Sequence, residues 1–487
     1  MGLFGILAAL GLLIFLAYRG WSILIIAPVA AMVAAAFSAQ PLLAHLTQTF
    51  MGSAAQFVMQ FFPIFLLGAL FGKLMEDSGS VASIADYMTK TLGPQRAILA
   101  VVLAGALVTY GGVSLFVAFF VLAPMAHALF KAAGIPKRLM PAAIALGTST
   151  FTMSALPGTP AIQNAIPMPF FGTTPFAAPG LGIIASAIMF GFGMWWLTRR
   201  AKSAQLAGEG YGAPSIAEEA PPVAAAEDKL VRERATTSGS FDPAEIRKSE
   251  ERPGLPPIAI AVLPLAVVII VNLLMSFVVL PRMDASYLAQ PEWGSTSLAA
   301  VGGVWAVITA LVAAIVVLVA LNFPGVPSLR ETFGAGCNAS ALPVLSVASL
   351  VGFGSVVAAL PAFAAVRDWV LSIEGGPLVS LAVATNILAS LTGSASGGLT
   401  IALDALGDTY MKLAAETGLN PELMHRVAVI GAGTLDSLPH NGAVVTLLAV
   451  CGCVHKESYL DIVMAAIVGA LLALVAVVGL GSAFGSF

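Results

Sequence analysis

Apolar runs recur from one end of this 487-residue chain to the other. A helix needs about 20 predominantly apolar residues to cross the hydrocarbon core of a bilayer, and several runs reach that length. Composition agrees, because 59% of the residues are hydrophobic and only 10% are charged, against roughly 25% charged in soluble domains. We therefore predict an all-α polytopic membrane protein.

A charged segment, residues 199–254, divides the chain. Nineteen of the 47 Asp, Glu, Lys and Arg residues fall within it, and large apolar residues are almost missing from it. This composition is typical of disorder, and basic residues beside the preceding apolar run favour a cytoplasmic location. We predict a disordered cytoplasmic linker between two membrane halves, residues 1–198 and 255–487. No basic patch indicates nucleic-acid binding.

Each half contains two polar interruptions within otherwise apolar sequence. The first half is broken near residues 110–114 and 154–160, and the second near residues 392–398 and 436–442. In each half the earlier break is a glycine- and serine-containing turn and the later break contains proline. Irregular backbone at membrane depth survives only where protein or a wet cavity covers it. We expect re-entrant hairpins or broken helices at these four breaks.

The two halves also carry matching motifs. The spacing Gly-(x4)-Leu-Met-(x6)-Gly over residues 134–147 recurs without a gap over residues 418–431, and residues 154–161 match residues 437–443 with one residue omitted. Hydropathy alone leaves open whether the repeats are parallel or inverted. Paired broken helices in matching halves are the best sequence pointer to a transporter's binding site.

Neutral groups at the breaks are the candidates for binding substrate. The N-terminus of a half-helix carries about half a unit of positive charge, which suits a carboxylate. No Lys or Arg lies within the breaks, so we expect a site without a fixed cation nearby. Small-residue packing between helices is the alternative for any one residue. The predicted substrate-binding residues are Ser154, Gly158, Thr159, Ser394, Ser396, Gly397, Gly398 and Asn441.

Three ionisable residues in apolar surroundings are candidates for ion coupling: Asp436, His440 and Asp404. Such groups are costly in a membrane unless they are paired, hydrated or protonated, so each is a functional candidate. Histidine or a desolvated aspartate can titrate near neutral pH. Alternatively, Asp436 caps the following half-helix and His440 bonds a freed carbonyl. His425 is interpreted as interfacial, and no cofactor or metal is predicted.

At its breaks the sequence resembles the gluconate permease family, within the ion transporter superfamily of secondary carriers. The resemblance covers nearly the whole chain and is anchored by Leu156–Ala161, Gly393–Gly398 and Asp436–Gly442. It implies inverted repeats, hairpins entering from opposite faces, elevator-like movement and a homodimer in a bacterial-type inner membrane. It also implies sugar acids such as gluconate, or shorter hydroxy- or keto-acids such as 3-hydroxybutyrate, as substrates.

The leading hypothesis is a proton symporter that imports a small organic anion. The small number of amides near the breaks and the absence of a fixed cation there favour a small monocarboxylate. A sodium-coupled carboxylate symporter is the alternative, because carbonyls and hydroxyls at broken helices are hard oxygen ligands. A passive channel is less favoured. An intramembrane enzyme is also less favoured, because the sequence lacks the Gly-x-Ser-x-Gly and His-Glu-x-x-His patterns.

Overall fold

The regular structure in the described part of the chain is entirely helical. The structure is a computed structural model, and the residues it describes are 2–18, 21–212, 255–322, 326, 328–439 and 441–487. Within these ranges seven helices are long and apolar enough to cross a membrane. An eighth is added if Ser80–Leu92 and Pro94–Tyr110, bent by 103° at their junction, form one broken span. The prediction of an all-helical polytopic membrane protein is confirmed.

The first half opens with a hairpin and closes with a long helix that runs past the predicted boundary at residue 198. Its main helices are α1 (Gly2–Tyr18), α2 (Ile23–Phe37), α4 (Met51–Asp77), α5 (Ser80–Leu92), α6 (Ala97–Tyr110), α7 (Leu115–Ala132), α8 (Met140–Thr148), α9 (Phe151–Ser154), α10 (Ile162–Ala165), α11 (Pro167–Phe171) and α12 (Pro179–Leu206). Residues 213–254, which make up most of the predicted linker, lie outside the described residues.

The second half repeats this order of elements. Its main helices are α14 (Ile258–Leu274), α15 (Leu298–Asn322), α16 (Leu329–Ala359), α17 (Phe363–Leu371), α18 (Gly376–Thr392), α19 (Ala395–Thr417), α20 (Pro421–Thr434), α21 (Gly442–Val450), α22 (His455–Ile462) and α23 (Gly469–Phe484). Each half has a hairpin, then a long helix with an internal proline, Pro63 in α4 and Pro343 in α16. A short helix, a broken helix pair and a second broken segment follow in both halves.

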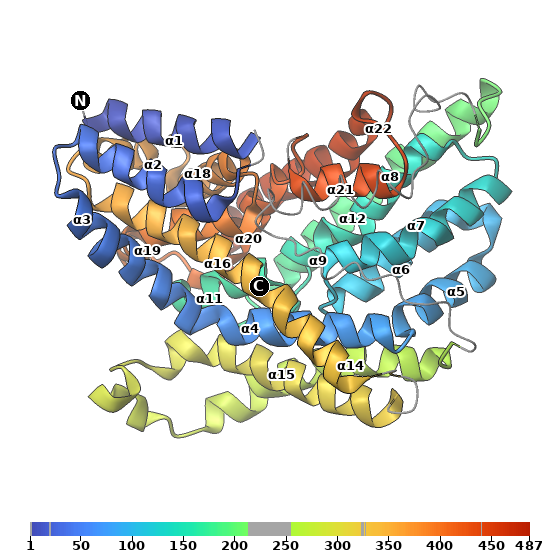
Figure 1. Ribbon diagram of the computed structural model, residues 1–487, viewed down its shortest axis with the longest axis horizontal. Coiled ribbons are helices and arrows are strands. Elements are labelled where there is room, and N and C mark those ends of the chain that lie inside the picture. Colours follow the sequence, from blue (N-terminus) through green and yellow to red (C-terminus); the bar gives the residue numbers. More distant parts are fainter. Residues whose placement is uncertain (1, 19–20, 213–254, 323–325, 327, 440) are drawn as a thin grey trace.

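The two long helices α4 and α16 pack against each other through the middle of the molecule (Figure 1). Gly336 of α16 lies against Leu70, whereas Gly352, sixteen residues later, lies against Phe50 at the end of the π-helical segment His45–Phe50 that leads into α4. Residue numbers therefore increase along α16 in the direction in which they decrease along α4. The corresponding long helices of the two halves run antiparallel.

Matching glycines perform matching packing roles in the two halves. A Cβ at Gly147 of α8 would lie 2.4 Å from the carbonyl oxygen of Val102 in α6. A Cβ at Gly431 of α20 would lie 2.4 Å from Oγ1 of Thr385 in α18. Each glycine lets its helix pack closely on the first helix of a broken pair, α8 on α6 and α20 on α18. The last glycine of the spacing motif therefore makes an equivalent contact in both halves.

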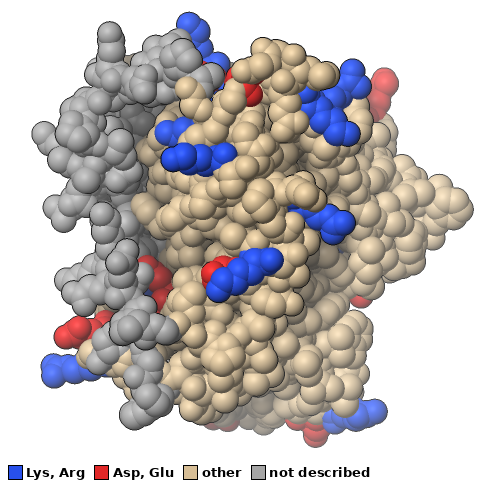
Figure 2. Space-filling model, turned by 90° about the vertical axis from the view of Figure 1, so that its right-hand side faces the viewer, with Lys and Arg blue, Asp and Glu red and all other residues tan. Residues whose placement is uncertain are grey.

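One side of the molecule is held together by a buried ionic cluster. Asp461 of α22 is fully buried and accepts hydrogen bonds from Arg138 Nη1 at 3.1 Å and Arg200 Nε at 2.9 Å. Arg138 also donates to both carboxylate oxygens of Glu209, at 2.7 and 3.0 Å. The contacts join the end of α12 to α22 and to the turn before α8. Figure 2 shows several Lys and Arg side chains on this side of the molecule.

Candidate functional site

All four breaks line one pocket of about 220 Å³. The break residues that line it are Gly112, Val113 and Ser114 from the first, Met153, Pro160 and Ala161 from the second, Gly393, Ser394, Ala395 and Ser396 from the third, and Asp436 and Asn441 from the fourth. The remaining wall comes mainly from α4 and α16 near their internal prolines. The tips of the broken helices therefore converge on one site, although some of them are more than three hundred residues apart in the sequence.

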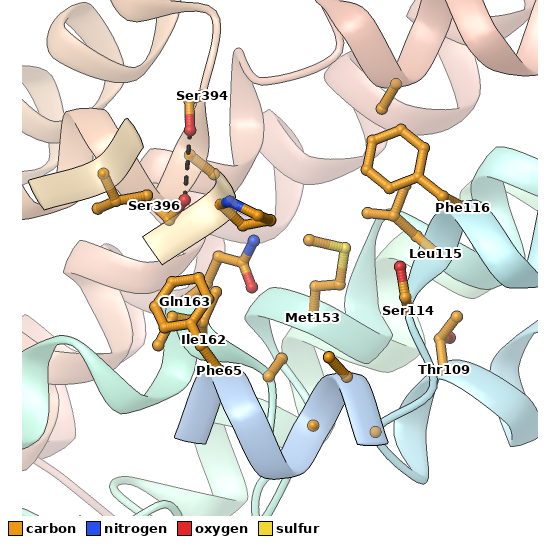
Figure 3. A pocket seen from close by; sticks show the side chains of 18 of the residues that line it. Phe65, Thr109, Ser114, Leu115, Phe116, Met153, Ile162, Gln163, Ser394 and Ser396 are labelled. Atoms are coloured by element: carbon orange, nitrogen blue, oxygen red, sulfur yellow. Dashed lines mark hydrogen bonds between the residues drawn. The ribbon is translucent and has the colours of Figure 1, made fainter. Parts of the chain in front are cut away.

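The pocket has a polar side and an apolar side. Figure 3 shows Met153 and Gln163 between the start of α7, marked by Ser114, and the serines at the start of α19. Phe65 of α4 lies below them in the same view. Among the described residues, no Lys, Arg or His lines this pocket. The site can therefore contact a carbon chain on one side and hydroxyl and amide groups on the other.

Asp436 neutralises the N-terminus of α19. Its Oδ1 accepts hydrogen bonds from the backbone N–H of Ala395 at 2.8 Å and from Asn441 Nδ2 at 2.8 Å. Ser394 caps the same helix, because its Oγ accepts from the N–H of Gly397 at 3.2 Å. A carboxylate beside the first N–H groups of a helix is stabilised by the helix dipole. The half-helix that follows Asp436, α21, is capped by Asn441 instead, so the predicted capping of that helix by Asp436 is wrong. Asp436 contacts the N-terminus of the earlier helix α19 and also faces the pocket.

The N-terminus of α7 is the counterpart of α19 in the first half, and its surroundings differ. Ser114, in extended conformation, precedes this 18-residue helix and makes no side-chain capping hydrogen bond. Ser114 and Leu115 line the pocket. When Ser154 is aligned with Ser437, Met153 occupies the position of Asp436. The first half thus presents a helix N-terminus to the pocket with a thioether where the second half has a carboxylate.

Three of the predicted substrate-binding residues, all within the second break, lie behind the wall of the pocket. Ser154 Oγ donates to the carbonyl oxygen of Thr150 at 3.1 Å, and Thr159 is 1% exposed. Gly158 has φ +81°, and a Cβ there would lie 2.5 Å from the ring of Phe176. The three residues shape the loop and do not line the pocket.

The other predicted residues divide between the pocket and its supports. Ser394, Ser396, Asn441 and Asp436 line the pocket. Gly397 and Gly398 lie in the first turn of α19, where a Cβ at Gly398 would approach the backbone of α18 within 2.2 Å. Asp404 is exposed, accepts a hydrogen bond from Ser355 of α16 and does not line the pocket. His440 lies outside the described residues.

A buried polar cluster behind the second break was not foreseen. His425 and Arg426 of α20 are both fully buried, so the interpretation of His425 as interfacial is wrong. His425 Nε2 donates to Asn164 Oδ1 at 3.2 Å, and Thr173 Oγ1 lies 2.6 Å from His425 Nδ1. Arg426 Nη1 donates to the carbonyl oxygen of Ser154 at 3.4 Å. The expectation of no fixed cation near the breaks is therefore also wrong, because a neighbouring helix brings one there.

The internal repeat contains the signal that could have revealed this arginine. The gap-free match between residues 134–147 and 418–431 aligns Arg426 with Ala142. An ionisable residue in a membrane helix, at a position where the matching half has alanine, is a functional candidate.

Comparison with known proteins gives the family. Residues 1–173 match the model of the GntP family permeases. The chain is 41% identical over 492 aligned residues to the uncharacterized transporter YxjC of Bacillus subtilis (strain 168), covering 99% of this chain and 100% of that protein. The chain belongs to the GntP permease family. It is accordingly a membrane transporter and not an enzyme, and the resemblance found from the breaks is confirmed.

Two solved structures share the fold. The YdaH transporter of Alcanivorax borkumensis has a TM-score of 0.54 at 18% identity, covering 91% of this chain and 89% of that one. MtrF of Neisseria gonorrhoeae, described as illuminating a class of antimetabolite efflux pumps, has a TM-score of 0.54 at 14% identity, with 91% and 85% covered. At these identities the likeness shows the architecture of the GntP-family chain alone.

Proposed function

We propose that this chain is a secondary active symporter that imports a small hydroxy- or keto-monocarboxylate, such as 3-hydroxybutyrate or gluconate, together with a proton. The observation that carries the proposal is the single pocket at the tips of all four broken helices, with one carboxylate in its wall. Binding sites of secondary transporters are typically formed by such discontinuous helices where two structural repeats meet.

The N-terminus of α7 is the proposed position of the substrate carboxylate. Its dipole favours an anion, and Ser114 and Thr109 add hydroxyl groups to the same part of the pocket. Phe65 and Met153 favour a short carbon chain on the apolar side. Because Asp436 already occupies the N-terminus of α19, the N-terminus of α7 remains for a substrate carboxylate, and a monocarboxylate therefore fits better than a dicarboxylate.

Asp436 is the proposed proton acceptor. It lies in the pocket wall, and its two hydrogen bonds hold one oxygen against α19. Protonation would remove the negative charge that faces an entering carboxylate, so proton and anion would bind together more readily than the anion alone. His440 and Asp404, also predicted to take part in coupling, remain secondary candidates.

The packing supports inverted repeats, and from the family resemblance we further propose elevator-like alternating access and a homodimer. The antiparallel course of α4 and α16 is what an inverted repeat requires. Basic residues gather where α12 ends and α8 begins, and short basic segments favour the cytoplasmic side of a membrane. We therefore place that side, with the linker, in the cytoplasm of a bacterial-type inner membrane.

Uptake into proteoliposomes tests the proposal. Purified protein is given labelled 3-hydroxybutyrate or gluconate with the outside acidic, and a protonophore is added in a parallel sample. We expect accumulation of at least one acid that the protonophore abolishes. Uptake of neither acid, or uptake indifferent to the pH gradient, would contradict the proposal. Replacing Na⁺ with choline at fixed pH distinguishes proton coupling from the sodium-coupled alternative. Sodium coupling predicts that uptake is lost in choline.

A paired substitution ties uptake to the pocket. Gly68 lines the pocket, and a Cβ there meets no atom within 4 Å. Gly52, on the same helix, also has open space around its Cβ but does not line the pocket. Gly68→Phe should abolish uptake by filling the site, whereas Gly52→Phe should leave it unchanged. Equal uptake by the two variants would exclude this pocket as the transport site.

A further inference from the structure

Arg426 has the largest side chain among those that are fully buried in the described residues. Its Nε and Nη2 donate to the carbonyl oxygen of Ala177 at 3.1 and 2.6 Å. Its Nη1 donates to the carbonyl oxygen of Ser154 and to Asn164 Oδ1, both at 3.4 Å. Every one of these acceptors is neutral.

No carboxylate of a described residue lies within ion-pair distance of Arg426. The arginines of the ionic cluster around Asp461 differ, because Arg138 and Arg200 both pair with that carboxylate. Burying a charge is costly unless a partner or several hydrogen bonds compensate it. The carbonyl groups around Arg426 satisfy its donors, but they leave its net positive charge in place.

This charge lies directly behind the pocket wall. Ser154, whose carbonyl oxygen it contacts, follows Met153, which lines the pocket. Tyr110 Oη donates to the carbonyl oxygen of Pro157 at 2.6 Å, so the first break is joined to the same loop. Gly182 of α12 completes the enclosure, since a Cβ there would lie 2.4 Å from the carbonyl oxygen of Ala155 and 3.4 Å from Arg426 Nε. These contacts enclose the guanidinium of Arg426 and exclude water from it. The enclosed charge lies behind the part of the pocket wall that the first half forms.

The two halves differ at the residues that carry charge. Arg426 aligns with Ala142, and Asp436 aligns with Met153. Both charged residues therefore come from the second half. Asp436 contacts the broken helix of its own half, whereas Arg426 reaches across to the break loop of the first half. The result is a pocket with a negative group on one side and a positive group behind the other.

We propose that Arg426 is a positioning residue that makes the first-half side of the pocket electropositive and so selects a singly charged anion over a neutral analogue. The inference rests on the proposed function and deepens it. In a site with low effective dielectric, a charge behind the wall attracts an anion without touching it. Combined with the dipole of α7, it gives the substrate carboxylate a preferred end of the pocket.

Three variants test the charge separately from the hydrogen bonds. Arg426→Lys keeps the charge but cannot reproduce the forked donors. Arg426→Gln removes the charge. Asn164→Asp leaves Arg426 in place and puts a carboxylate oxygen where Asn164 Oδ1 now accepts from it. Uptake of labelled 3-hydroxybutyrate and gluconate is measured in proteoliposomes, and folding is checked by gel filtration and thermal melting. Competition by butane-1,3-diol, the neutral analogue of 3-hydroxybutyrate, is compared with competition by the unlabelled acid.

We expect KM for the acid to rise at least about tenfold in Arg426→Gln and Asn164→Asp, equivalent to about 1.4 kcal/mol, with the maximal rate per folded molecule kept. Butane-1,3-diol should then compete better relative to the acid. Arg426→Lys should keep a KM close to that of the wild type, and a raised KM in this variant still refutes the proposal if the other two variants do not fold. A raised KM in Arg426→Lys, or an unchanged KM in a folded Arg426→Gln, would overturn the proposed role of Arg426 and leave the proposed function standing. Absence of uptake in the wild type would overturn the proposed function and this inference with it.

Discussion

Replacing Asp436 with asparagine is the sharpest test of proton coupling. Asp436 Oδ1 accepts hydrogen bonds of 2.8 Å from the N–H of Ala395 and from Asn441 Nδ2. An asparagine has an oxygen of the same size in the same place, so both bonds can persist. What the substitution removes is the charge and the ability to take up a proton.

The structure sets the expected magnitudes. A hydrogen bond to a charged group contributes about 1.5–3 kcal/mol and a neutral one about 0.5–1.5 kcal/mol. The two weakened bonds are partly offset because a half-buried charge no longer has to be desolvated. Asp436→Asn should therefore lower the stability only slightly. Asp436→Ala leaves two donors without their acceptor, at about 1–3 kcal/mol each if they stay buried, and should melt at a lower temperature.

Asp436→Asn should change accumulation of substrate strongly, although it changes stability only slightly. One proton carried with one monoanion permits accumulation of at most about tenfold for each unit of pH gradient. We expect the wild type to approach this ratio with labelled 3-hydroxybutyrate. Asp436→Asn should fall to a ratio near one while retaining exchange of labelled for unlabelled substrate at equal pH. Exchange requires the alternating-access movement but no net proton transfer.

One result would refute the reasoning directly. If Asp436→Asn accumulates substrate to the wild-type ratio under the same pH gradient, Asp436 does not carry the proton. If the variant loses exchange as well as accumulation, Asp436 is needed for the binding site itself and its role is not confined to proton coupling. Melting curves of both variants and the wild type exclude unfolding as the cause.

Three further substitutions probe the remaining features. Asp404→Asn should keep gradient-driven accumulation, measured in the same vesicles, because Asp404 lies outside the pocket; loss of accumulation would restore it as a coupling residue. Gly147→Val should lower the melting temperature markedly, because a Cβ there would lie 2.4 Å from the carbonyl oxygen of Val102, whereas Gly191→Val, with nothing within 4 Å, should not. Asp461→Asn removes the buried carboxylate that the half-buried Arg138 and Arg200 share, while Arg138 keeps Glu209, and should cost about 1.5–3 kcal/mol, measured by thermal melting; an unchanged melting curve would show that Asp461 does not stabilise the cluster.

The broken helices were predictable because their causes are local. Clusters of glycine, serine and proline favour a helix break, because glycine adopts non-helical backbone conformations and proline lacks the N–H that continues a helix. The break predicted at residues 110–114 lies between the end of α6 at Tyr110 and the start of α7 at Leu115. The break predicted at residues 392–398 begins where α18 ends, at Thr392. Its second part is already helical, because Ser394 caps α19 and the following glycines are needed for close packing on α18.

The residues that face the pocket were only partly predictable. Ser394, Ser396, Asp436 and Asn441 do line it, whereas Ser154 and other residues of the first half's proline-containing break lie behind it. Composition identifies a polar loop but does not say which side of the loop turns toward a cavity. That choice is made by the neighbours of the loop, here Phe176 and the helices that pack on it.

The sequence alone determined the membrane class, the four breaks and the internal repeat, because these depend on hydropathy and on residues close together in the chain. Only the tertiary structure decided that the four breaks share one pocket and that Arg426 lies behind its first-half wall. Arg426 bonds to Ser154, 272 positions away in the sequence. No local preference encodes such a contact, since it arises when α20 packs against a loop of the other half.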